Sequence, residues 1–340
     1  MNKLRFTYIA LMMLLSLALK AQESSTAYTF LEVSPSSHVY GLGGHNVSLV
    51  DDDINLIEQN PALMGPEIDK QIGVNYMRYL AQSNFMGARY GMGINEHSAW
   101  AAGVEYYGYG SFTATDPDGT ITGKFSAHDL AFSGTYTHDI KGDWRAGITV
   151  KVLSSTYERY SALALAADLG ISYYNADSDF AFGFVIKNLG GQVKRFNETH
   201  DNLPWDIQAG ITKGLGRSPF RFSITLTNLR RWKLNYYAPA DKNNPSEGLR
   251  EETRFFPNLL RHITFALEYA PTNKIYIGLG YDYRTRTNMS TYQRNILSGF
   301  SLCGGLKVRG FGFGAAVAQP HVGGFTFMLN VSCTLSELMN

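Results

Sequence analysis

Serine, lysine and histidine are the side chains with which this chain would build a hydrolase or bind zinc, so their spacing is the first test of its chemistry. Acylation by a Ser-x-x-Lys pair requires a lysine one helical turn after the nucleophile, and no serine in the 340 residues has a lysine three positions later. The eight histidines include no pair at i and i+4, and none has a cysteine at the spacing of a zinc site. The sequence therefore predicts neither this acylation chemistry nor a zinc centre.

Two further patterns could bind ions or phosphates. Asp51, Asp52 and Asp53 could hold calcium, but the staggered ligands of a calcium loop are missing, so we expect a solvated turn. The Gly-x-Gly-x-Gly run at positions 310–314 lies in a strand-like segment, where glycine more often relieves crowding than binds phosphate. We expect no metal, no cofactor and no enzyme activity. A surface protease or lipase assembled from scattered residues stays as the alternative, because it would leave no local motif.

Composition limits both the partners and the fold. The 30 basic and 29 acidic residues give a formal net charge of +1, so no electrostatic argument favours binding to a nucleic acid. Only 17% of residues are charged, 13% are aromatic and 34 are glycine, which disfavours a helical bundle and favours half-buried strands. A mean hydropathy of −0.16 is too low for a bundle of membrane helices.

The first residues have the features of an export signal. Lys3 and Arg5 form a basic start, an apolar run extends from Phe6 to Leu19, and the small residue Ala21 precedes the expected cleavage site. We predict a signal peptide at residues 1–21 and a mature protein outside the cytoplasm. A retained anchor is the alternative, but the apolar run is shorter than the roughly 20 residues that a spanning helix needs.

From Gln71 onward, apolar and polar residues alternate with the period of a β-strand. The last segment shows this best, because every second residue from Phe325 to Leu335 is apolar or cysteine. We predict about fourteen strands, most of them near the roughly 9 to 11 residues that cross a bilayer when tilted. They lie near residues 71–79, 83–93, 98–108, 128–138, 143–154, 163–174, 179–188, 205–213, 219–228, 262–270, 274–283, 299–308, 310–318 and 324–335.

The links between these strands are predicted to alternate in length. Short links, expected to be periplasmic turns, lie near residues 93–96, 139–142, 175–178, 271–273 and 309–310. Longer links, expected to be surface loops, span residues 109–127, 155–162, 189–204, 229–261 and 284–298. This alternation predicts an all-β fold, a closed antiparallel outer-membrane β-barrel over residues 71–336 with long extracellular loops. A soluble β-sandwich is the alternative, although it has no reason to alternate short and long links.

Aromatic residues recur near the ends of the predicted strands, where rings at headgroup level form interfacial girdles. They are Tyr76, Tyr79, Tyr106, Tyr107, Tyr109, Tyr173, Tyr174, Trp205, Tyr281 and Tyr283. An aromatic track that binds sugar is the alternative for the group from Tyr106 to Tyr109.

The longest predicted loop, from Leu229 to Arg261, combines arginine with aromatic residues, the mixture found at contact hot spots. Its candidate partner-binding residues are Arg230, Arg231, Trp232, Tyr236, Tyr237, Phe255 and Phe256. We therefore expect a protein partner at this loop. For Arg230 to Lys233, a rim of side chains that snorkel above the bilayer is an equal alternative.

Residues 22–70 do not alternate and are predicted to form a compact hatch before the barrel. Glycines in this segment allow backbone conformations closed to other residues, and Pro61 holds Asn60 outside the helical region. The candidate hatch residues are Gly43, Gly44, Asp51, Asp52, Asp53, Asn60, Pro61 and Ala62.

The block that runs from Gly41-Leu42-Gly43-Gly44 through the three aspartates to Gln59-Asn60-Pro61-Ala62-Leu63 resembles the amino-terminal block of the PorV/PorQ family of type IX secretion proteins. Its Asn-Pro-Ala triplet is similar to the hatch motif of FadL-type fatty-acid transporters, which are barrels of fourteen strands. The resemblance implies the outer membrane of a Gram-negative bacterium of the Bacteroidetes type. The short chain favours the PorQ branch of the family over the PorV branch.

The resemblance further implies a non-enzymatic component of the type IX secretion system that anchors a surface partner similar to PorZ. That partner would lie with the PorV/PorU complex, in the machinery that attaches cargo to anionic lipopolysaccharide. Outer-membrane lipid and lipopolysaccharide are the other expected partners. The alternative is a FadL-like outer-membrane transporter, in which the hatch around Asn60, Pro61 and Ala62 opens a path for hydrophobic compounds.

Overall fold

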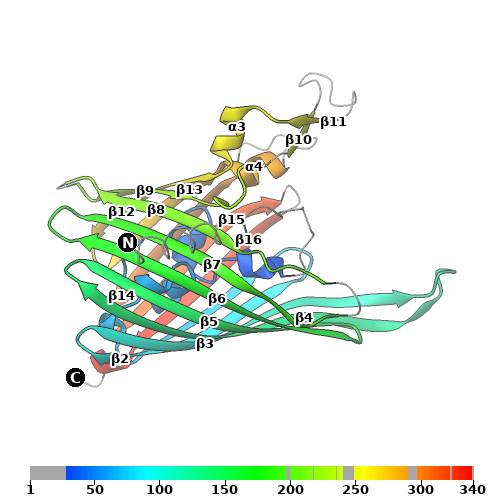
Figure 1. Ribbon diagram of the computed structural model, residues 1–340, viewed down its shortest axis with the longest axis horizontal. Helices are drawn as coiled ribbons and strands as arrows, with labels where there is room; N and C mark the ends of the chain where they lie inside the picture. Colours follow the sequence, from blue (N-terminus) through cyan, green and yellow to red (C-terminus); the bar gives the residue numbers. More distant parts are fainter. Residues whose placement is uncertain are drawn as a thin grey trace, which may run out of the picture.

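The computed structural model describes residues 28–196, 200–216, 218–234, 236–239, 249–289, 297–321 and 324–338. The predicted signal peptide at residues 1–21 lies outside the described residues. The described part of the chain forms a barrel of tilted strands, with short helical turns inside it and a small cap beside its mouth (Figure 1). Within this part, no helix combines the length and the apolar character needed to cross a membrane.

Fourteen antiparallel strands close into a barrel, as predicted. Each strand pairs with its neighbours in sequence, except that β9 pairs with β12 and β1 closes the barrel against β16. The strands are β1 (Gln71–Arg78), β2 (Asn84–Asn95), β3 (Ser98–Thr115), β4 (Ile121–Lys141), β5 (Trp144–Tyr157), β6 (Tyr160–Asn175), β7 (Phe180–Lys194), β8 (Asp206–Gly214), β9 (Phe220–Leu226), β12 (Ile263–Thr272), β13 (Ile275–Asp282), β14 (Phe300–Val308), β15 (Phe311–His321) and β16 (Gly324–Thr334).

Outward and inward side chains alternate along these strands, because successive residues of a strand point to opposite faces. On β1, Ile72, Val74 and Tyr76 are exposed on the outer surface, whereas Gln71 and Asn75 are buried on the inner side. An outward band of apolar side chains around a closed barrel is the surface that lipid covers. The β-sandwich alternative is excluded, because a sheet closed on itself has no second sheet against which to bury this face.

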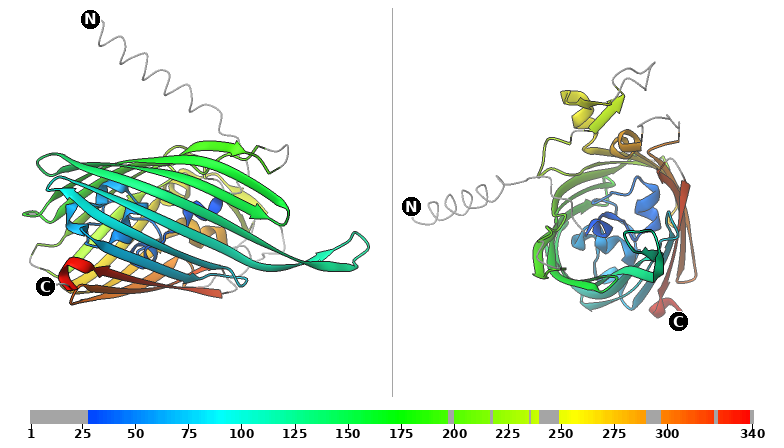
Figure 2. Two further views of the ribbon diagram at one scale, coloured as in Figure 1. Left: turned by 90° about the horizontal axis from the view of Figure 1, so that it is seen from below. Right: turned by 90° about the vertical axis from the view of Figure 1, so that its right-hand side faces the viewer.

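The segment before the first strand lies inside the barrel (Figure 2). We call its described part, residues 28–70, the hatch. It contains η1 (Thr29–Glu32), α2 (Ser37–Gly41), η2 (Ile54–Glu58), η3 (Pro61–Leu63) and η4 (Pro66–Ile68). Helix α2 packs against β13 to β16, the turns η2 and η4 pack against β1 to β3, and η3 packs against β4 to β6. The hatch therefore contacts most of the barrel wall.

The link at residues 109–127, predicted as a loop, is instead a β-hairpin, which we call the hairpin arm. β3 continues to Thr115 and β4 starts at Ile121, so both strands project beyond the rest of the barrel mouth (Figures 1 and 2). The ring of Phe112 stacks on that of Phe125 at 5.3 Å across the two strands. Cross-strand pairs of this kind stabilise a ladder, and they extend it after the two strands have left the barrel wall.

The link at residues 155–162 is also shorter than predicted. β5 ends at Tyr157 and β6 begins at Tyr160, and these two residues pair directly across a tight turn. Glu158 in the turn has a φ of 58°, the left-handed conformation that such a turn requires. The alternation of short and long links is therefore weaker than predicted on this side of the mouth.

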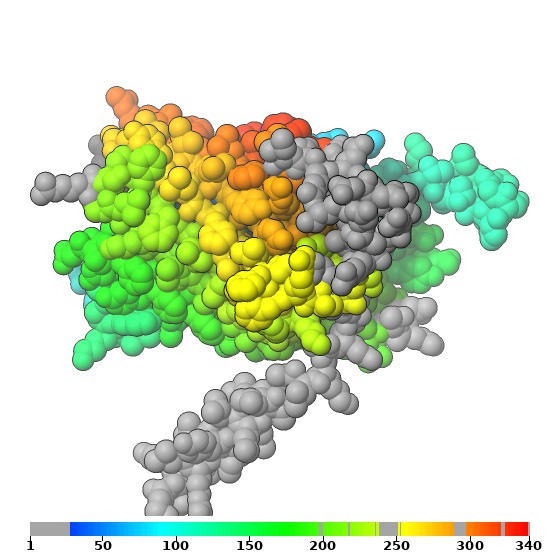
Figure 3. Space-filling model, turned by 90° about the horizontal axis from the view of Figure 1, so that it is seen from above, coloured from blue at the N-terminus to red at the C-terminus, as the bar shows by residue number. Residues whose placement is uncertain are grey.

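The link between β9 and β12 folds into a cap, which comprises the described residues between 229 and 261. It contains β10 (Tyr236–Pro239), β11 (Leu249–Glu252) and α3 (Phe255–Leu260). Viewed down the barrel, α3 and the two-stranded sheet lie outside the ring of strands and not over the lumen (Figure 2), and α3 stands on the side of the barrel (Figure 3). Helix α4 (Tyr283–Met289) follows β13 at the rim, and α5 (Leu335–Leu338) follows β16.

Candidate functional site

Asn60 connects the hatch to the barrel wall. Its side-chain oxygen accepts a hydrogen bond from the amide of Ala62 at 3.0 Å, which caps the turn η3. Its side-chain nitrogen donates to the carbonyl of Val47 at 3.0 Å and to the carbonyl of Ile171 on β6 at 3.2 Å. Pro61 occupies the first position of η3, where its fixed φ suits a helical turn and its missing N–H costs nothing. The Asn-Pro-Ala triplet is thus a structural joint.

The wall leaves room for this joint. A Cβ atom on Gly170 of β6 would lie 2.0 Å from the side-chain oxygen of Asn60, so only glycine lets the hatch approach so closely. The predicted hatch residues Gly43 and Gly44 form the turn after α2, with φ values of 98° and 84° that favour glycine. These two glycines shape the backbone and lie apart from Asn60.

The three aspartates have different roles. Asp51 forms an ion pair with Lys307 on β14, and Asp53 caps η2 by accepting a hydrogen bond from the amide of Asn55 at 3.0 Å. Only Asp52, with 73% of its side chain exposed, matches the expected solvated turn. The expectation was wrong for the other two, because Asp51 meets Lys307 on the barrel wall and Asp53 accepts hydrogen bonds from Asn55 within the hatch. No group of three possible metal ligands occurs among the described residues.

His38 is the centre of one buried charge cluster. Its ring on α2 stacks on Tyr276 of β13 at 3.7 Å, and it contacts the carboxylates of Asp51 at 3.3 Å and of Glu268 on β12. Glu268 in turn pairs with Arg221 on β9. Burial alone would lower the pKa of His38, but the two carboxylates outweigh it and raise the pKa to about 9. The charged imidazole therefore links the hatch to the wall.

Glu58 is the centre of a second buried cluster. Its carboxylate lies 3.3 Å from Lys151 on β5 and 3.5 Å from Arg89 on β2. Arg89 also pairs with Glu105, and Lys151 lies 2.6 Å from Asp168. Burial would raise the pKa of Glu58, but Lys151 and Arg89 outweigh it and lower the pKa to about 2.

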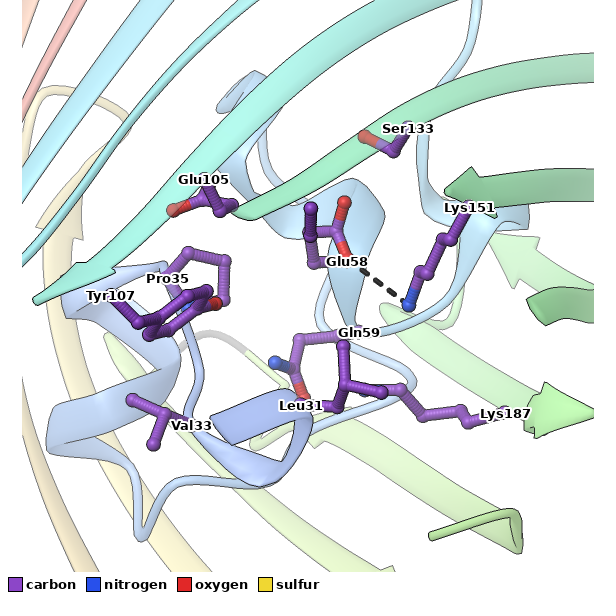
Figure 4. A pocket seen from close by; sticks show the side chains of 11 residues that line it. Leu31, Val33, Pro35, Glu58, Gln59, Glu105, Tyr107, Ser133, Lys151 and Lys187 are labelled. Carbon is purple, nitrogen blue, oxygen red and sulfur yellow. Dashed lines mark ion pairs between the residues drawn. The ribbon is translucent and has the colours of Figure 1, made fainter. Parts of the chain in front are cut away.

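Figure 4 shows Glu58 and Lys151 facing each other beside a cavity of about 20 Å³, enough for about one water molecule. None of the wall residues of the two clusters was predicted from the sequence as a site residue. Their signal was a charged residue at an inward strand position, as at Glu105 or Asp168.

Aromatic residues also line the mouth of the barrel. Tyr76 and Tyr106 face outward, as a girdle requires, but the girdle prediction was wrong for Tyr107, which is 5% exposed. The ring of Tyr107 packs on Phe30 of the hatch at 4.8 Å. Tyr79 and Tyr109 also turn inward, where the ring of Tyr79 stacks on Phe85 and the hydroxyl of Tyr109 donates to the carboxylate of Asp129.

A cavity of about 530 Å³ opens at this mouth between the hatch, the β1–β2 turn and α4. Its lining includes Phe30, Tyr40, His45, Tyr79, Tyr109 and Arg284. Rings with hydroxyl groups and a few charged groups suit a small, largely apolar ligand that also carries a polar group. A molecule in this cavity would contact the hatch at Phe30 and Tyr40.

The cap brings together some of the predicted partner-binding residues. The ring of Trp232 stacks on His262 at 5.1 Å and packs on Phe255 at 5.6 Å. Exposure is 47% for Trp232, 63% for Tyr237, 58% for Phe255 and 74% for Phe256.

The other predicted residues of the cap pack on the rim. The guanidinium of Arg230 lies 4.4 Å above the ring of Trp205, and Arg261 lies 4.5 Å above the ring of Tyr236. The amide of Arg231 donates to the carbonyl of Asn228 at 3.0 Å, at the end of β9. The predicted set is therefore divided between an exposed group and a group that supports the cap.

Polar side chains hold the cap in place. The side chain of Asn258 donates to the carbonyl of Trp232 at 2.6 Å and accepts from the amide of Leu234 at 2.8 Å. The ring nitrogens of His262 lie 2.8 Å from the carbonyl of Thr227 and 2.9 Å from that of Trp232. These bonds explain why the chain folds here, although its sequence predicted only a loop.

Comparison of the sequence with models of protein families finds no match, and comparison with curated proteins finds none either. Among solved structures, the fold is similar to that of a FadL homologue from Pseudomonas aeruginosa, with a TM-score of 0.51 and 13% identity over 88% of this chain and 98% of that chain. The toluene transporter TodX from Pseudomonas putida gives a TM-score of 0.51 and 10% identity over 91% and 98% of the two chains. The monoaromatic hydrocarbon channel CymD gives a TM-score of 0.52 and 10% identity over 91% and 99%. The chain thus has the fold of the FadL-like outer-membrane β-barrels, which confirms the predicted fold class.

Proposed function

We propose that this protein is a non-enzymatic scaffold in the outer membrane of a Bacteroidetes-type Gram-negative bacterium, where its cap anchors a surface protein. The resemblance of residues 41–63 to the PorV/PorQ family supports a role in type IX secretion, with the PorQ branch favoured. A PorZ-like protein is the proposed partner, and the PorV/PorU complex and lipopolysaccharide are its proposed surroundings.

The observation that carries this proposal is the exposure of large aromatic side chains on the cap. Tyr237 is 63% exposed and Phe256 is 74% exposed, although apolar surface of this kind is costly to leave in water. The cap that carries them lies outside the ring of strands (Figure 2). In the space-filling view, α3 stands on the surface of the barrel (Figure 3). Aromatic and arginine side chains together are typical of protein contact hot spots.

The hatch supports a scaffold in preference to a conduit. Two clusters of buried ion pairs, centred on His38 and Glu58, tie it to the wall. Withdrawal of the hatch would leave several buried charges without their partners, which typically costs about 3 to 5 kcal/mol for each broken pair. A hydrophobic solute that crossed the lumen would also have to pass these charges.

The double variant Tyr237→Ala and Phe256→Ala tests the proposal. We expect a folded barrel in the outer membrane that no longer retains its surface partner, since each anchor contributes about 2 kcal/mol to binding. The control is Ile140→Ala, because Ile140 is 58% exposed on β4 near the opposite end of the barrel. Surface proteins bound to the purified barrels are quantified by mass spectrometry. Equal retention by the double variant and the control would reject the cap as the anchoring site.

A FadL-like transporter is the second candidate, and the cavity of about 530 Å³ at the mouth favours it. The similar structures include proteins described as a toluene transporter and a monoaromatic hydrocarbon channel. Uptake of labelled toluene by vesicles that contain the barrel tests this function. Ser83 lines the cavity and is 7% exposed, so Ser83→Trp should block uptake, with Ser83→Ala as the matched control. Uptake no faster than that of empty vesicles would reject a transporter of such compounds.

A further inference from the structure

The hairpin arm has two sheet edges that its neighbours leave open. The last pair of the β2–β3 ladder is Asn84 with Gly108, and the last pair of the β4–β5 ladder is Ala127 with Tyr157. Beyond these pairs, and apart from one hydrogen bond between Glu158 and Ser126, the strands of the arm pair only with each other among the described residues. A two-stranded ribbon of this kind presents backbone N–H and C=O groups along both sides, ready to pair with another chain.

The hydrogen bonds at the base of the arm show which residue faces the open edge of β4. The amide of Glu158 donates to the carbonyl of Ser126 at 3.2 Å, so Ser126 faces the side of β5. Backbone groups alternate in direction along an antiparallel strand, and the pairing with β3 is regular from Ser126 to Gly123. The N–H and C=O of Lys124 therefore also face this side, past the end of β5.

The opposite edge is less suited to pairing. β3 carries an extra residue between Gly108 and Ser111, where the register shifts against β4. A bulge of this kind bends the strand and is a common way to protect an edge. β4 also carries an extra residue, Thr122, but this bulge lies nearer the tip, and β4 is regular from Ser126 to Gly123, directly after the end of β5. The edge of β4 at Lys124 is therefore the more regular one.

An open groove of about 560 Å³ lies beside this edge of β4. Its lining is Ser111, Lys124, Phe125, Ser126, Glu158 and Arg159. The turn between β5 and β6 forms one end of the groove, so a strand laid in it would continue the sheet where β5 stops. The groove has two basic residues and one acidic residue, which favours an acidic occupant.

The exposed residues of the arm also favour strand addition. Ile121 is 70% exposed and Phe112 is 42% exposed, and such residues have high β propensity. On β4, the charge of Lys124 and the bulge at Thr122 protect the edge, and Pro117 lies in the turn at the tip. The arm thus combines an open edge with residues that stabilise a sheet.

We infer that the edge of β4 at Lys124 binds an extended, acidic segment of the surface partner by strand addition. The backbone of the segment would pair with Lys124, and its acidic side chains would meet Lys124 and Arg159 in the groove. A second copy of the chain is a poorer occupant. Two copies in one membrane have the same orientation, so their β4 edges would pair as parallel strands. This pairing would place the two Lys124 side chains next to each other, and like charges at such positions are destabilising.

This inference rests on the proposed function, because it takes the surface partner as the occupant. Lys124→Pro removes the backbone N–H that faces the open edge. This N–H points away from β3, so the substitution breaks no hydrogen bond between β3 and β4. Lys124→Ala is the matched control, since it removes the charge and keeps the amide. A third variant replaces residues 110–126 with a short glycine turn and leaves the ladder at Gly108 intact.

Binding is measured as retention of the surface protein that co-purifies with the unaltered chain, and the contact is mapped with a photo-crosslinker at position 124. We expect the Pro variant to bind about fivefold more weakly than the Ala variant, since one backbone hydrogen bond contributes about 1 kcal/mol. The arm deletion should lose most of the retention. Crosslinks should fall on a contiguous acidic segment of the partner, and the Lys124 amide should exchange more slowly in the complex than in the stripped barrel.

Three outcomes overturn the inference. In the first, the arm deletion retains the surface protein fully while the cap variant Tyr237→Ala and Phe256→Ala loses it. This result would reject the arm as a binding site and would agree with the proposed function. In the second, no surface protein co-purifies with the unaltered chain, which would reject both the proposed function and the inference. Crosslinks to a second copy of the chain would instead assign the edge to self-association.

Discussion

The hatch and the hairpin arm both lie outside the regular ladder of the barrel. The polar groups of the hatch are paired, whereas those at the edge of the arm are open. In the hatch, the charged side chains of His38 and Glu58 each meet two partners on the wall or in the hatch itself. In the arm, the backbone of Lys124 faces an open edge and Ile121 is 70% exposed. The charges of the interior are thus paired within the protein, whereas the arm leaves backbone and apolar groups accessible, as the proposed partner site requires.

The largest effect on stability is expected from removal of the carboxylate of Glu58. Glu58→Ala leaves Arg89 and Lys151 buried without one of their partners, so the free energy of unfolding should fall by about 3 kcal/mol. Urea titration of the barrel in detergent measures it. Asp52→Ala is the control, because Asp52 is 73% exposed and should change stability by less than about 0.5 kcal/mol. Equal effects of the two substitutions would contradict a hatch held by buried ion pairs.

The second test uses pH. The pKa of His38 in the folded protein is about 9, above its ordinary value of 6.5, so its contribution to stability is complete below about pH 6.5 and is lost as the pH rises through 9. The pKa of Glu58 is lowered to about 2 from its ordinary 4.5, so its contribution is present above about pH 4.5 and is lost as the pH falls toward 2.

Urea midpoints should therefore be highest near neutral pH and decline toward pH 10. His38→Gln should lower the midpoint at pH 7 and flatten the alkaline decline, because the group that loses its proton is gone. An unchanged alkaline decline in this variant would assign the effect to another group.

A third and smaller effect comes from the close approach of hatch and wall. Gly170→Ala places a methyl group where Asn60 now lies, so the joint must shift, at a cost of about 1 to 3 kcal/mol. Gly134→Ala on β4 is the matched control, since its Cβ would meet nothing within 4 Å. Hydrogen exchange of the hatch amides should quicken in the first variant and stay unchanged in the second. If both exchange alike, the hatch does not depend on this contact.

The fourteen strands could be predicted because a period of two is a local property of the sequence. In β16, the alternation of Phe325, Phe327 and Leu329 with polar neighbours determines both the strand and its outward face. The same property limits the prediction. The alternation shows that Tyr107 and Glu105 share a face of β3. It does not show that Tyr107 packs on Phe30 or that Glu105 pairs with Arg89.

The parts of the fold that could not be predicted from the sequence depend on contacts between distant segments. The arm was predicted as a loop because strand lengths were matched to the bilayer, whereas Phe112 and Phe125 extend the ladder beyond it. The cap was predicted as a loop because its fold depends on hydrogen bonds between residues far apart in sequence. Asn258 and His262, at the end of the cap, bond to Trp232, near its start. Local patterns do not contain such pairings.

The smallest expected effects distinguish the two aromatic groups within the cap. The ring of Trp232 stacks on His262 and packs on Phe255, so Trp232→Ala should loosen the cap by about 1 kcal/mol and speed its cleavage by protease. Tyr237 is 63% exposed, and Tyr237→Ala should leave cap stability within about 0.5 kcal/mol of the unaltered protein.

Partner retention should respond differently, because the ring of Tyr237 is 63% exposed and accessible for contact, whereas that of Trp232 packs within the cap. Tyr237→Ala should weaken retention without faster proteolysis, while Trp232→Ala should weaken it only as far as the cap unfolds. Limited proteolysis and co-purification on the same membranes measure both quantities. If Tyr237→Ala speeds proteolysis as much as Trp232→Ala does, the two rings belong to one structural unit. The exposed face of the cap would then serve to stabilise the barrel rim, in contrast to the open edge of the arm.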